Sequence, residues 1–548
     1  MPPQQTPDAR VDGNDAKGQA MARGDRQPRG LREPSSCTAT GSTGSEDESD
    51  QHIVLRFAEE NFPDCFALYG NLLSWDTAWK TVLEPGSEYW TWFAGGQLNV
   101  SFNCVDRHLA HDRNKAAFIW VPEPESDGPR AMTYQVLFRK VNEFAALLRD
   151  TFGVTAGDRV AIHLPTVPEL PVSMLACARL GAIHCVIDPE TDPEGCATQI
   201  TDSGSRVVVT MDGKYRAGEL CDHKAVTDDA LRIARTRGHA VESVLVWRRW
   251  PREYSSRADM VEGRDFFCND AVTDHRGKTV EPVPMPAEAP LFLLYADTVA
   301  GPSGYQYSTA GYLAYAAGIC KYYYDIHIPD THWCAADPGG LTGHTALIYG
   351  PLALGATSVL YEGSLTYPDA GRPWRIAERH GITAFHADAD AVELLRRLGP
   401  AEPARYRHDF KHIGVFGTQL APDTRRWFDE TVGRRRAALT ETWWEHEAGG
   451  LLGGVAPALH PVSPEDHWPL ALGLYGAVYD DQGRMMEPGS GLVGDIYIRR
   501  PWPGMPQTIW GRPERFRQMH LGGERHERFF TGRRGTQDSG GCYRIVPE

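Results

Sequence analysis

Residues 159–187 read RVAIHLPTVPELPVSMLACARLGAIHCVI, and they indicate the fold class more clearly than any other stretch. The segment predicts a strand over residues 159–164, a helix through 174–180 that ends at Gly181, and a second strand over 183–187. Both strands are mostly apolar along their length, which is typical of a parallel sheet covered on both faces. A helix between two such strands is the connection that parallel pairing requires.

The same alternation continues on both sides of this stretch. Thr133 precedes an amphipathic helical pattern, and short β-branched runs follow at residues 206–210 and 243–247, with a helix that ends at Gly238 between them. Strands and helices alternate again over residues 291–442, whereas the last hundred residues show short strands and many turns. We therefore expect an α/β fold with parallel-sheet subdomains and a smaller β-rich subdomain.

The composition excludes two classes of function. The chain has 548 residues, with 56 Lys and Arg against 72 Asp and Glu, and a net charge of -16. Because phosphate backbones require clustered cations, we expect no nucleic-acid partner. Mean hydropathy is -0.41, and the most apolar region, residues 344–361, is interrupted by Gly350, Pro351 and Gly355. That region predicts a buried strand and turn, so we expect no membrane partner and a cytoplasmic location.

Cysteine and histidine spacing gives no sign of a metal centre. The eleven cysteines include no CxxC pair, and no ligand spacing stands out. Residues 1–50 are polar and end in an acidic run, which predicts a disordered tail. Residues 51–110 are rich in aromatic side chains and predict an irregular cap on a body over 111–548, divided at about 111–290, 291–440 and 441–548.

Eight unusual strings then occur in a fixed order. They are WFAGGQLNVS (92–101), NCVDRHL (103–109), MLACAR (174–179), GAIH (181–184), TGH (342–344), YGPL (349–352), TWW (442–444) and RPWPGM (500–505). Together they closely resemble the acetyl-CoA synthetases, the AMP-forming short-chain acyl-CoA ligases of the adenylate-forming superfamily. The resemblance implies the large N-terminal domain of an adenylate-forming enzyme over 111–548, preceded by an acetyl-CoA-synthetase-type cap.

The resemblance also implies a reaction and its ligands. In this family a carboxylate attacks the α-phosphate of ATP, and the CoA thiol then displaces AMP, so the ligands implied are ATP or AMP, Mg²⁺, CoA and a small carboxylate. The residues matched to family roles are Glu447 for Mg²⁺ and catalysis, with Thr298 as a second catalytic candidate; Gly417, Thr418, Gln419, Glu441, Thr442 and Trp443 for the nucleotide; Leu341, Thr342, Phe416 and Trp444 for the acyl pocket; and Arg216 for CoA. A packing role remains an alternative for each of them.

The phosphate-binding loop departs from the family pattern. The family reads YTSGSTGKPKG, whereas residues 295–304 read YADTVAGPSG and contain no lysine. Asp297 places an anion where polyphosphate oxygens would lie, and Val299 replaces a hydroxyl donor. A unit charge about 4 Å away is worth about 4 kcal/mol at an effective dielectric of about 20, so this exchange opposes ATP binding. Mg²⁺ bound at Asp297 is the alternative that would rescue it.

A second departure lies in FFTGRR (529–534), where the family has YFTGDG. The family Asp accepts hydrogen bonds from the ribose hydroxyls, but Arg533 has donors only. Arg533 could instead pair with a phosphate or with Asp297, or it could be an exposed, tolerated residue. The acyl pocket changes as well: Phe416 replaces a smaller Val, and Gly340 replaces a Trp.

A third departure concerns the small C-terminal domain, which carries the family's mobile catalytic Lys. The resemblance stops near residue 545, and no Lys follows Lys411, so we expect that domain to be absent and CoA binding to be doubtful. Two hypotheses result. The chain is a degraded homologue with a binding, regulatory or partner role, its protein partner at the surface left by that domain. Alternatively, it is a repurposed ligase for a small carboxylate, or it retains residual acetate–CoA ligase activity.

Overall fold

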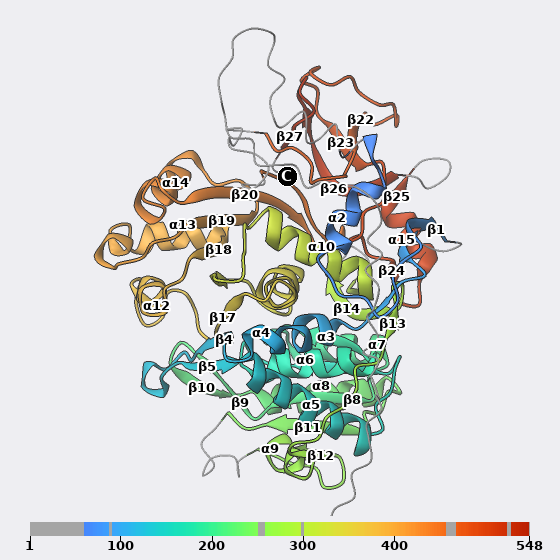
Figure 1. Cartoon of the computed structure of the whole chain (residues 1–548), viewed down its shortest axis with the longest axis vertical. Coiled ribbons are helices and arrows are strands. Elements are labelled where there is room, and N and C mark those ends of the chain that lie inside the picture. Colours follow the sequence, from blue (N-terminus) through green and yellow to red (C-terminus); the bar gives the residue numbers. More distant parts are fainter. Residues whose placement is uncertain are drawn as a thin grey trace, which may run out of the picture. The chain divides into compact units, whose positions relative to one another are not determined.

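The computed structural model describes residues 58, 60–86, 90–249, 258–296, 301–455, 467–522 and 528–546. The predicted tail over residues 1–50 lies outside these ranges. Within them, no helix is both long enough and apolar enough to cross a bilayer. Two eight-stranded sheets and a smaller sheet carry most of the described strands (Figure 1).

The first large sheet is built around the stretch quoted at the outset. In order across the sheet its strands are β12 (Asp265–Phe267), β11 (Ser243–Trp247), β8 (Val207–Met211), β6 (Arg159–His163), β7 (Ile183–Ile187), β14 (Pro290–Ala296), β15 (Ser303–Ser308) and β24 (Thr508–Ile509). The strands from β12 to β14 pair in parallel, which confirms the predicted parallel sheet.

Helices cover both faces of this sheet. Val160 and Ile162 of β6 belong to the core shared with α5 (Tyr134–Asp150) and α6 (Glu169–Leu180), whereas Ala161 belongs to the core shared with α7 (Pro193–Ser203) and α8 (His223–Thr236). Because successive strand residues point to opposite faces, apolar residues at consecutive positions are buried on both sides.

Local signals set the ends of two of these helices. The Thr133 hydroxyl accepts a hydrogen bond from the Val136 amide and caps α5. Gly181 ends α6 with φ +72°, and a Cβ at this position would lie 2.4 Å from Met285 Sδ. Glycine is therefore required both by the backbone conformation and by the close approach of Met285.

The second large sheet combines two strands from residues 116–133 with strands from residues 331–454. Its order is β21 (Gly450–Gly454), β20 (Ala438–Glu445), β19 (His412–Gly417), β18 (Ala384–Asp388), β16 (Thr331–Cys334), β17 (Thr357–Tyr361), β4 (Ala116–Val121) and β5 (Arg130–Thr133). Strands β4 and β5 therefore lie in this sheet, and β14 and β15 lie in the first. The subdomain bounds expected near residues 290 and 440 therefore do not coincide with the bounds of the sheets.

Helices of the second half lie around the second sheet. Alongside β18 and β19 lie α13 (Ala389–Leu398) and α14 (Pro422–Trp427), while α12 (Arg372–His380) precedes β18 (Figure 1). By contrast, α10 (Thr309–Tyr322) is buried from Thr309 to Cys320. A helix that is apolar all round belongs in a core.

The apolar region 344–361 differs from its prediction of strand and turn. It contains a π-helical turn, η6 (Gly343–Tyr349), followed by α11 (Gly350–Ala353), and only β17 is a strand. A Cβ on Gly350 would lie 2.3 Å from Cys320 Sγ, so the two helices α11 and α10 approach closely there. Tertiary packing of this kind overrides the local signal of Gly and Pro.

The third sheet contains β22 (Gly476–Tyr479), β23 (Gly494–Ile498), β26 (Arg528–Gln537), β25 (Leu521–Gly522) and β27 (Tyr543–Ile545), all antiparallel. It matches the smaller β-rich subdomain expected for the end of the chain. Helix α15 (Pro513–His520) leads into β25.

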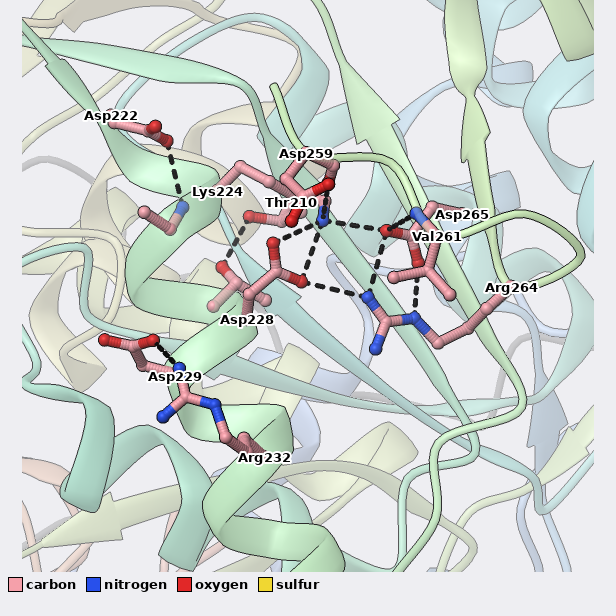
Figure 2. Close-up of polar contacts among 12 residues, drawn as sticks. Thr210, Asp222, Lys224, Asp228, Asp229, Arg232, Asp259, Val261, Arg264 and Asp265 are labelled. Atoms are coloured by element: carbon pink, nitrogen blue, oxygen red, sulfur yellow. Dashed lines mark hydrogen bonds and ion pairs between the residues drawn. The ribbon is translucent and has the colours of Figure 1, made fainter. Parts of the chain in front are cut away.

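A buried ionic network fastens α8 to β12 (Figure 2). The Lys224 ammonium, 1% exposed, donates to both Asp228 oxygens at 2.8 and 2.7 Å and to Asp265 Oδ2 at 2.8 Å. The Arg264 guanidinium donates to the same two carboxylates. Every charge in the network thus has an opposite partner, which is the condition under which buried ions are tolerated.

Candidate active site

Glu447 lies in the turn between β20 and β21, and the packing of that turn fixes its position. The Tyr307 hydroxyl donates to the His446 carbonyl at 2.8 Å. Gly449 has φ +87°, and a Cβ there would lie 1.8 Å from the Gly504 carbonyl oxygen. The string RPWPGM, which contains Gly504, is therefore pressed against the turn. Among the described residues, Glu447 makes no ion pair or side-chain hydrogen bond.

Glu447 lines a cavity of about 660 Å³ at the carboxyl ends of β7 and β14. The lining contains five carboxylates and, among the described residues, no Lys or Arg; these carboxylates are Asp188, Glu190, Asp192, Asp337 and Glu447. Ligands of α/β sheets commonly bind at this end of the strands. The cavity is therefore well placed for a ligand but strongly anionic.

The pKa values of Asp337 and of the neighbouring His446 are shifted in this cavity. Partial desolvation in the cavity, together with repulsion from Asp188, raises the pKa of Asp337 to about 7, although the residue as a whole is exposed. The Gly339 amide donates to Asp337 Oδ1 at 2.6 Å and opposes this rise. Loss of solvent around its ring lowers the pKa of His446, although the residue is exposed overall and the Glu447 carboxylate opposes the change. Near pH 7 the Asp337 carboxyl is therefore partly protonated.

The expected phosphate loop falls mostly outside the described residues. Asp297, Thr298 and Val299 lie there, so their roles stay predictions. Its flanks are well defined: the Tyr295 hydroxyl donates to Asp202 Oδ2 at 2.8 Å, and a Cβ on Gly304 would lie 2.8 Å from the Tyr295 ring. The loop thus starts and ends on the adjacent antiparallel strands β14 and β15.

Arg533 has a partner that the sequence analysis did not consider. Its Nε donates to Glu445 Oε1 at 2.7 Å, and Nη2 donates to Oε2 at 3.4 Å. The Trp443 indole donates to the same Oε1 at 2.7 Å. Burial raises the pKa of Glu445, and the bonds from Arg533 and Trp443 only partly offset that rise. Arg533 is therefore not simply an exposed, tolerated residue, and it joins the third sheet to the second.

Glu441 is also occupied by neighbouring protein groups. Its carboxylate accepts from the Leu420 amide at 2.9 Å and from Arg425 Nε at 2.7 Å. These contacts hold the segment that follows β19. Gly417, the last residue of β19, has φ +99° and open space at its Cβ position, and Thr418 is exposed. A planar ligand could therefore approach Gly417 without displacing a side chain.

The residues expected in the acyl pocket come from three segments. Trp444 and Leu341 both approach Gly450, within 3.1 and 3.7 Å of its Cβ position. The Trp444 indole donates to the Thr442 hydroxyl at 3.0 Å, and Phe416 is the strand partner of Thr442. Leu341, Phe416 and Trp444 belong to one apolar cluster. Thr342 is 5% exposed and precedes η6. Their role toward an acyl group stays a prediction.

Arg216 lies apart from Glu447 and lines a second cavity, of about 470 Å³. Its side chain is 70% exposed and pairs with Glu190 at 3.2 Å, and Lys214 Nζ pairs with the same carboxylate at 2.6 Å. Glu190 and Asp337 line both cavities. The two expected ligand regions therefore meet at these two carboxylates.

The sequence analysis did not single out four of these acids. Asp188, Glu190 and Asp192 directly follow β7, and Asp337 follows β16. Their position after predicted parallel strands was the available signal, since side chains there face the ligand edge of a sheet. No sequence signal pointed to Glu445 as the partner of Arg533, because their pairing depends on contact between distant segments.

Comparison with known proteins agrees with this geometry. The family model "AMP-binding enzyme" matches residues 105–506, and "Acetyl-coenzyme A synthetase N-terminus" matches residues 54–104. The acetyl-coenzyme A synthetase of Wolinella succinogenes is 38% identical over 468 residues, which cover 85% of this chain and 70% of that protein. The chain belongs to the AMP-binding enzyme family, in its acetyl-CoA synthetase group.

A second relative agrees with this assignment, and a solved structure agrees with the fold. The acetyl-coenzyme A synthetase of Pyrobaculum arsenaticum is 38% identical over 473 residues, covering 84% of this chain and 69% of that protein. The solved acetoacetyl-CoA synthetase of Streptomyces lividans superposes with a TM-score of 0.78 at 23% identity, over 90% of this chain and 74% of that one. This likeness confirms the adenylate-forming fold.

Proposed function

We propose that this acetyl-CoA synthetase homologue binds a nucleotide or a small carboxylate in the cleft at Glu447 but activates acetate with ATP very slowly, and that it serves a binding, regulatory or partner role. The observation that carries the proposal is the charge of the cavity: five carboxylates line it, Glu190 among them being paired with Lys214 and Arg216, and no described Lys or Arg lines the cavity itself. At about 4 Å, each carboxylate that faces a phosphate oxygen costs about 4 kcal/mol at an effective dielectric of about 20.

The ribose region supports the same proposal. Arg533 stands where the family has an Asp, and its guanidinium is engaged by the buried Glu445. Donors alone cannot accept hydrogen bonds from ribose hydroxyls. Another group could accept hydrogen bonds from the ribose hydroxyls at this position only if the pair of Arg533 with Glu445 opened. Opening the pair would leave Glu445 buried without its cation, which is costly.

Glu447 fits a bound Mg²⁺. Mg²⁺ is commonly held by one or two carboxylates together with substrate phosphates and waters, rather than by a full protein cage. Glu447 is an unengaged carboxylate among the described residues, and these include no cluster of three or more His, Cys, Asp or Glu suited to a metal. Mg²⁺ would supply neutralising charge for ATP or AMP, and we propose CoA as a third, weaker ligand at Arg216.

Two measurements test the proposed function. Calorimetry with AMP should detect binding, with a Kd in the micromolar to millimolar range, that weakens in the variant Trp443→Ala. ATP–pyrophosphate exchange with acetate should remain near background. Absence of AMP binding would remove the nucleotide-binding part of the proposal, and rapid exchange would remove the slow-activation part.

A second candidate function is a ligase for a different small acid. A specific observation favours it: Gly340, where the family has a Trp, lines the cavity, and a Cβ there would meet the Asp337 carbonyl at 3.5 Å and His446 Nε2 at 3.7 Å without a clash. That space borders an anionic wall, which suits a carboxylate with a polar or cationic substituent. Exchange assays with a panel of two- to four-carbon acids, including amino acids, would reveal it.

A protein partner is also proposed, at the third sheet. Met485, Leu492 and Val493 lie on the connection between β22 and β23, and each is at least 45% exposed. Exposed apolar residues close in sequence favour a contact surface. Size-exclusion chromatography of the chain mixed with an active acetyl-CoA synthetase would test for a complex of the two.

A further inference from the structure

Residues 214–218, named here the Arg216 loop, are held by groups from the second large sheet. The loop runs through β9 (Gly213–Arg216), which pairs with β10 (Glu219–Asp222). Glu123, two residues after β4, accepts hydrogen bonds from the Ala217 amide at 3.1 Å and from the Gly218 amide at 2.8 Å. Its side chain is fully enclosed by protein, since the residue is 2% exposed.

The backbone of the loop is shaped to receive this carboxylate. Ala217 has φ +49° and Gly218 has φ +86°. These are the conformations of the two-residue turn that joins β9 to β10, and in this turn both amides donate to Glu123. A non-glycine residue in this region is strained and persists only where its surroundings determine it, so Glu123 helps to keep Ala217 in place.

Further contacts fix the side chains of the loop. The Arg249 guanidinium lies 4.5 Å from the Tyr215 ring and donates to both oxygens of Glu362, at 2.8 and 3.0 Å. Glu362 directly follows β17, and its side chain is 0% exposed. The Arg216 loop is therefore clamped by groups that follow two neighbouring strands, β4 and β17.

We propose that Glu123 is a positioning residue that preorganises the Arg216 loop for the phosphate-bearing end of CoA. The inference rests on the proposed function, and specifically on weak CoA binding at Arg216. Arg216 and Lys214 line the second cavity, and Glu123 lines it too. A loop already fixed in its bound conformation loses less entropy when a ligand binds.

The charge of Glu123 allows an experiment to separate its electrostatic effect on CoA from its effect on the position of the loop. As an anion at the cavity wall, Glu123 repels a phosphate, so neutralising it should tighten CoA binding if electrostatics alone mattered. In the variant Glu123→Gln one amide oxygen remains, but the side-chain NH₂ faces the second loop amide and cannot accept from it. If positioning dominates, CoA binding becomes weaker.

The experiment compares Glu123→Gln with Glu125→Gln, which removes a nearby carboxylate that pairs with Arg372 and makes no hydrogen bond or ion pair with the loop within the described part of the chain. Kd values for CoA and for AMP are measured by calorimetry, and hydrogen exchange is followed in the peptide 213–222. We expect Glu123→Gln to raise the Kd for CoA about tenfold, to leave that for AMP within about twofold, and to accelerate exchange in the peptide. The variant Glu125→Gln should change none of the three.

Three results would overturn the inference. Unchanged or tighter CoA binding in Glu123→Gln would show that the carboxylate does not position the loop for this ligand. Equal losses for CoA and AMP would show a general structural role. A wild-type chain that binds AMP but not CoA would remove the ligand while leaving nucleotide binding intact, so the two proposals can fail separately.

Discussion

Arg533 Nε donates to Glu445 Oε1 across 2.7 Å, and this contact joins β26 of the third sheet to β20 of the second. Glu445 immediately precedes the turn that carries His446 and Glu447. The arginine that occupies the family's ribose-binding position is thus part of the framework of the candidate site. Its effect on stability and its effect on ligands can be measured separately.

Replacing Arg533 by Ala leaves the Glu445 carboxylate buried without its cation. We expect the free energy of unfolding to fall by about 1–3 kcal/mol at pH 8. The pKa of Glu445 is already raised by burial, and losing Arg533 raises it further. A raised carboxyl pKa lowers stability above the unfolded pKa, so the loss should be smaller near pH 4.5. Urea denaturation at both pH values measures it.

The neighbouring arginine provides the control for that variant. Arg534 is 52% exposed and pairs with Asp481 and Asp495 at the surface. Its replacement by Ala should change stability by less than about 0.5 kcal/mol at either pH. Equal effects of the two substitutions would contradict a specific role for the pair of Arg533 with Glu445.

Asp337→Asn should stabilise the protein by a small, pH-dependent amount, because Asp337 is exposed and water screens its interactions. The folded pKa of Asp337 is raised to about 7 from an ordinary value of 3.8, so the folded state binds this proton more tightly than the unfolded state. Wild-type stability from this group therefore declines as pH rises from about 4 to 7. The variant lacks the titration, so its melting temperature should exceed that of the wild type at pH 8 and match it more closely at pH 5. A larger gain at pH 5 would contradict the assignment.

Lys224→Met tests the buried network of Figure 2. The change leaves Asp228 and Asp265 without the ammonium that both contact, and we expect a loss of about 3–5 kcal/mol. Arg232→Ala is the matched control, because Arg232 lies on the same helix, is 70% exposed and, among the residues that the structure describes, pairs with Asp229 alone. It should cost less than about 0.5 kcal/mol. Similar denaturation midpoints for the two variants would count against the network.

Gly218→Ala tests the packing of the Arg216 loop. A Cβ at Gly218 would lie 2.0 Å from the Tyr367 hydroxyl, and φ is +86°. Gly483→Ala isolates the backbone cost, because Gly483 has φ +72° and no atom within 4 Å of its Cβ position. We expect about 1 kcal/mol for Gly483→Ala and clearly more for Gly218→Ala. Adding Tyr367→Ala to Gly218→Ala should recover part of that excess; if it adds to the loss instead, the clash is not the cause.

The sequence predicted the parts of this fold that depend on local signals. The strands β7 and β11 match their predicted ranges because their apolar runs are bounded by turns, and Thr133 and Gly181 mark helix ends through hydrogen-bonding and φ requirements. The placement of β4 beside β17 was not predictable from pattern, since that pairing joins residues more than 200 positions apart. The π-helical turn before Gly350 results from close packing on α10, which leaves no periodic signal.

The candidate site divides in the same way. Glu447, Trp444 and Phe416 were predicted from motifs, and their roles stay predictions, whereas Glu123 and Glu445 were not singled out because they act through contacts with distant segments. Asp297 and Thr298 lie outside the described residues, so their expected roles remain predictions.

The most direct test of the central claim is ATP–pyrophosphate exchange with acetate, measured beside the acetyl-coenzyme A synthetase of Wolinella succinogenes. If the anionic cavity and the engaged Arg533 oppose ATP as argued, the exchange rate should be at least about a thousandfold lower, which corresponds to about 4 kcal/mol. An exchange rate within about tenfold of that relative would contradict the account.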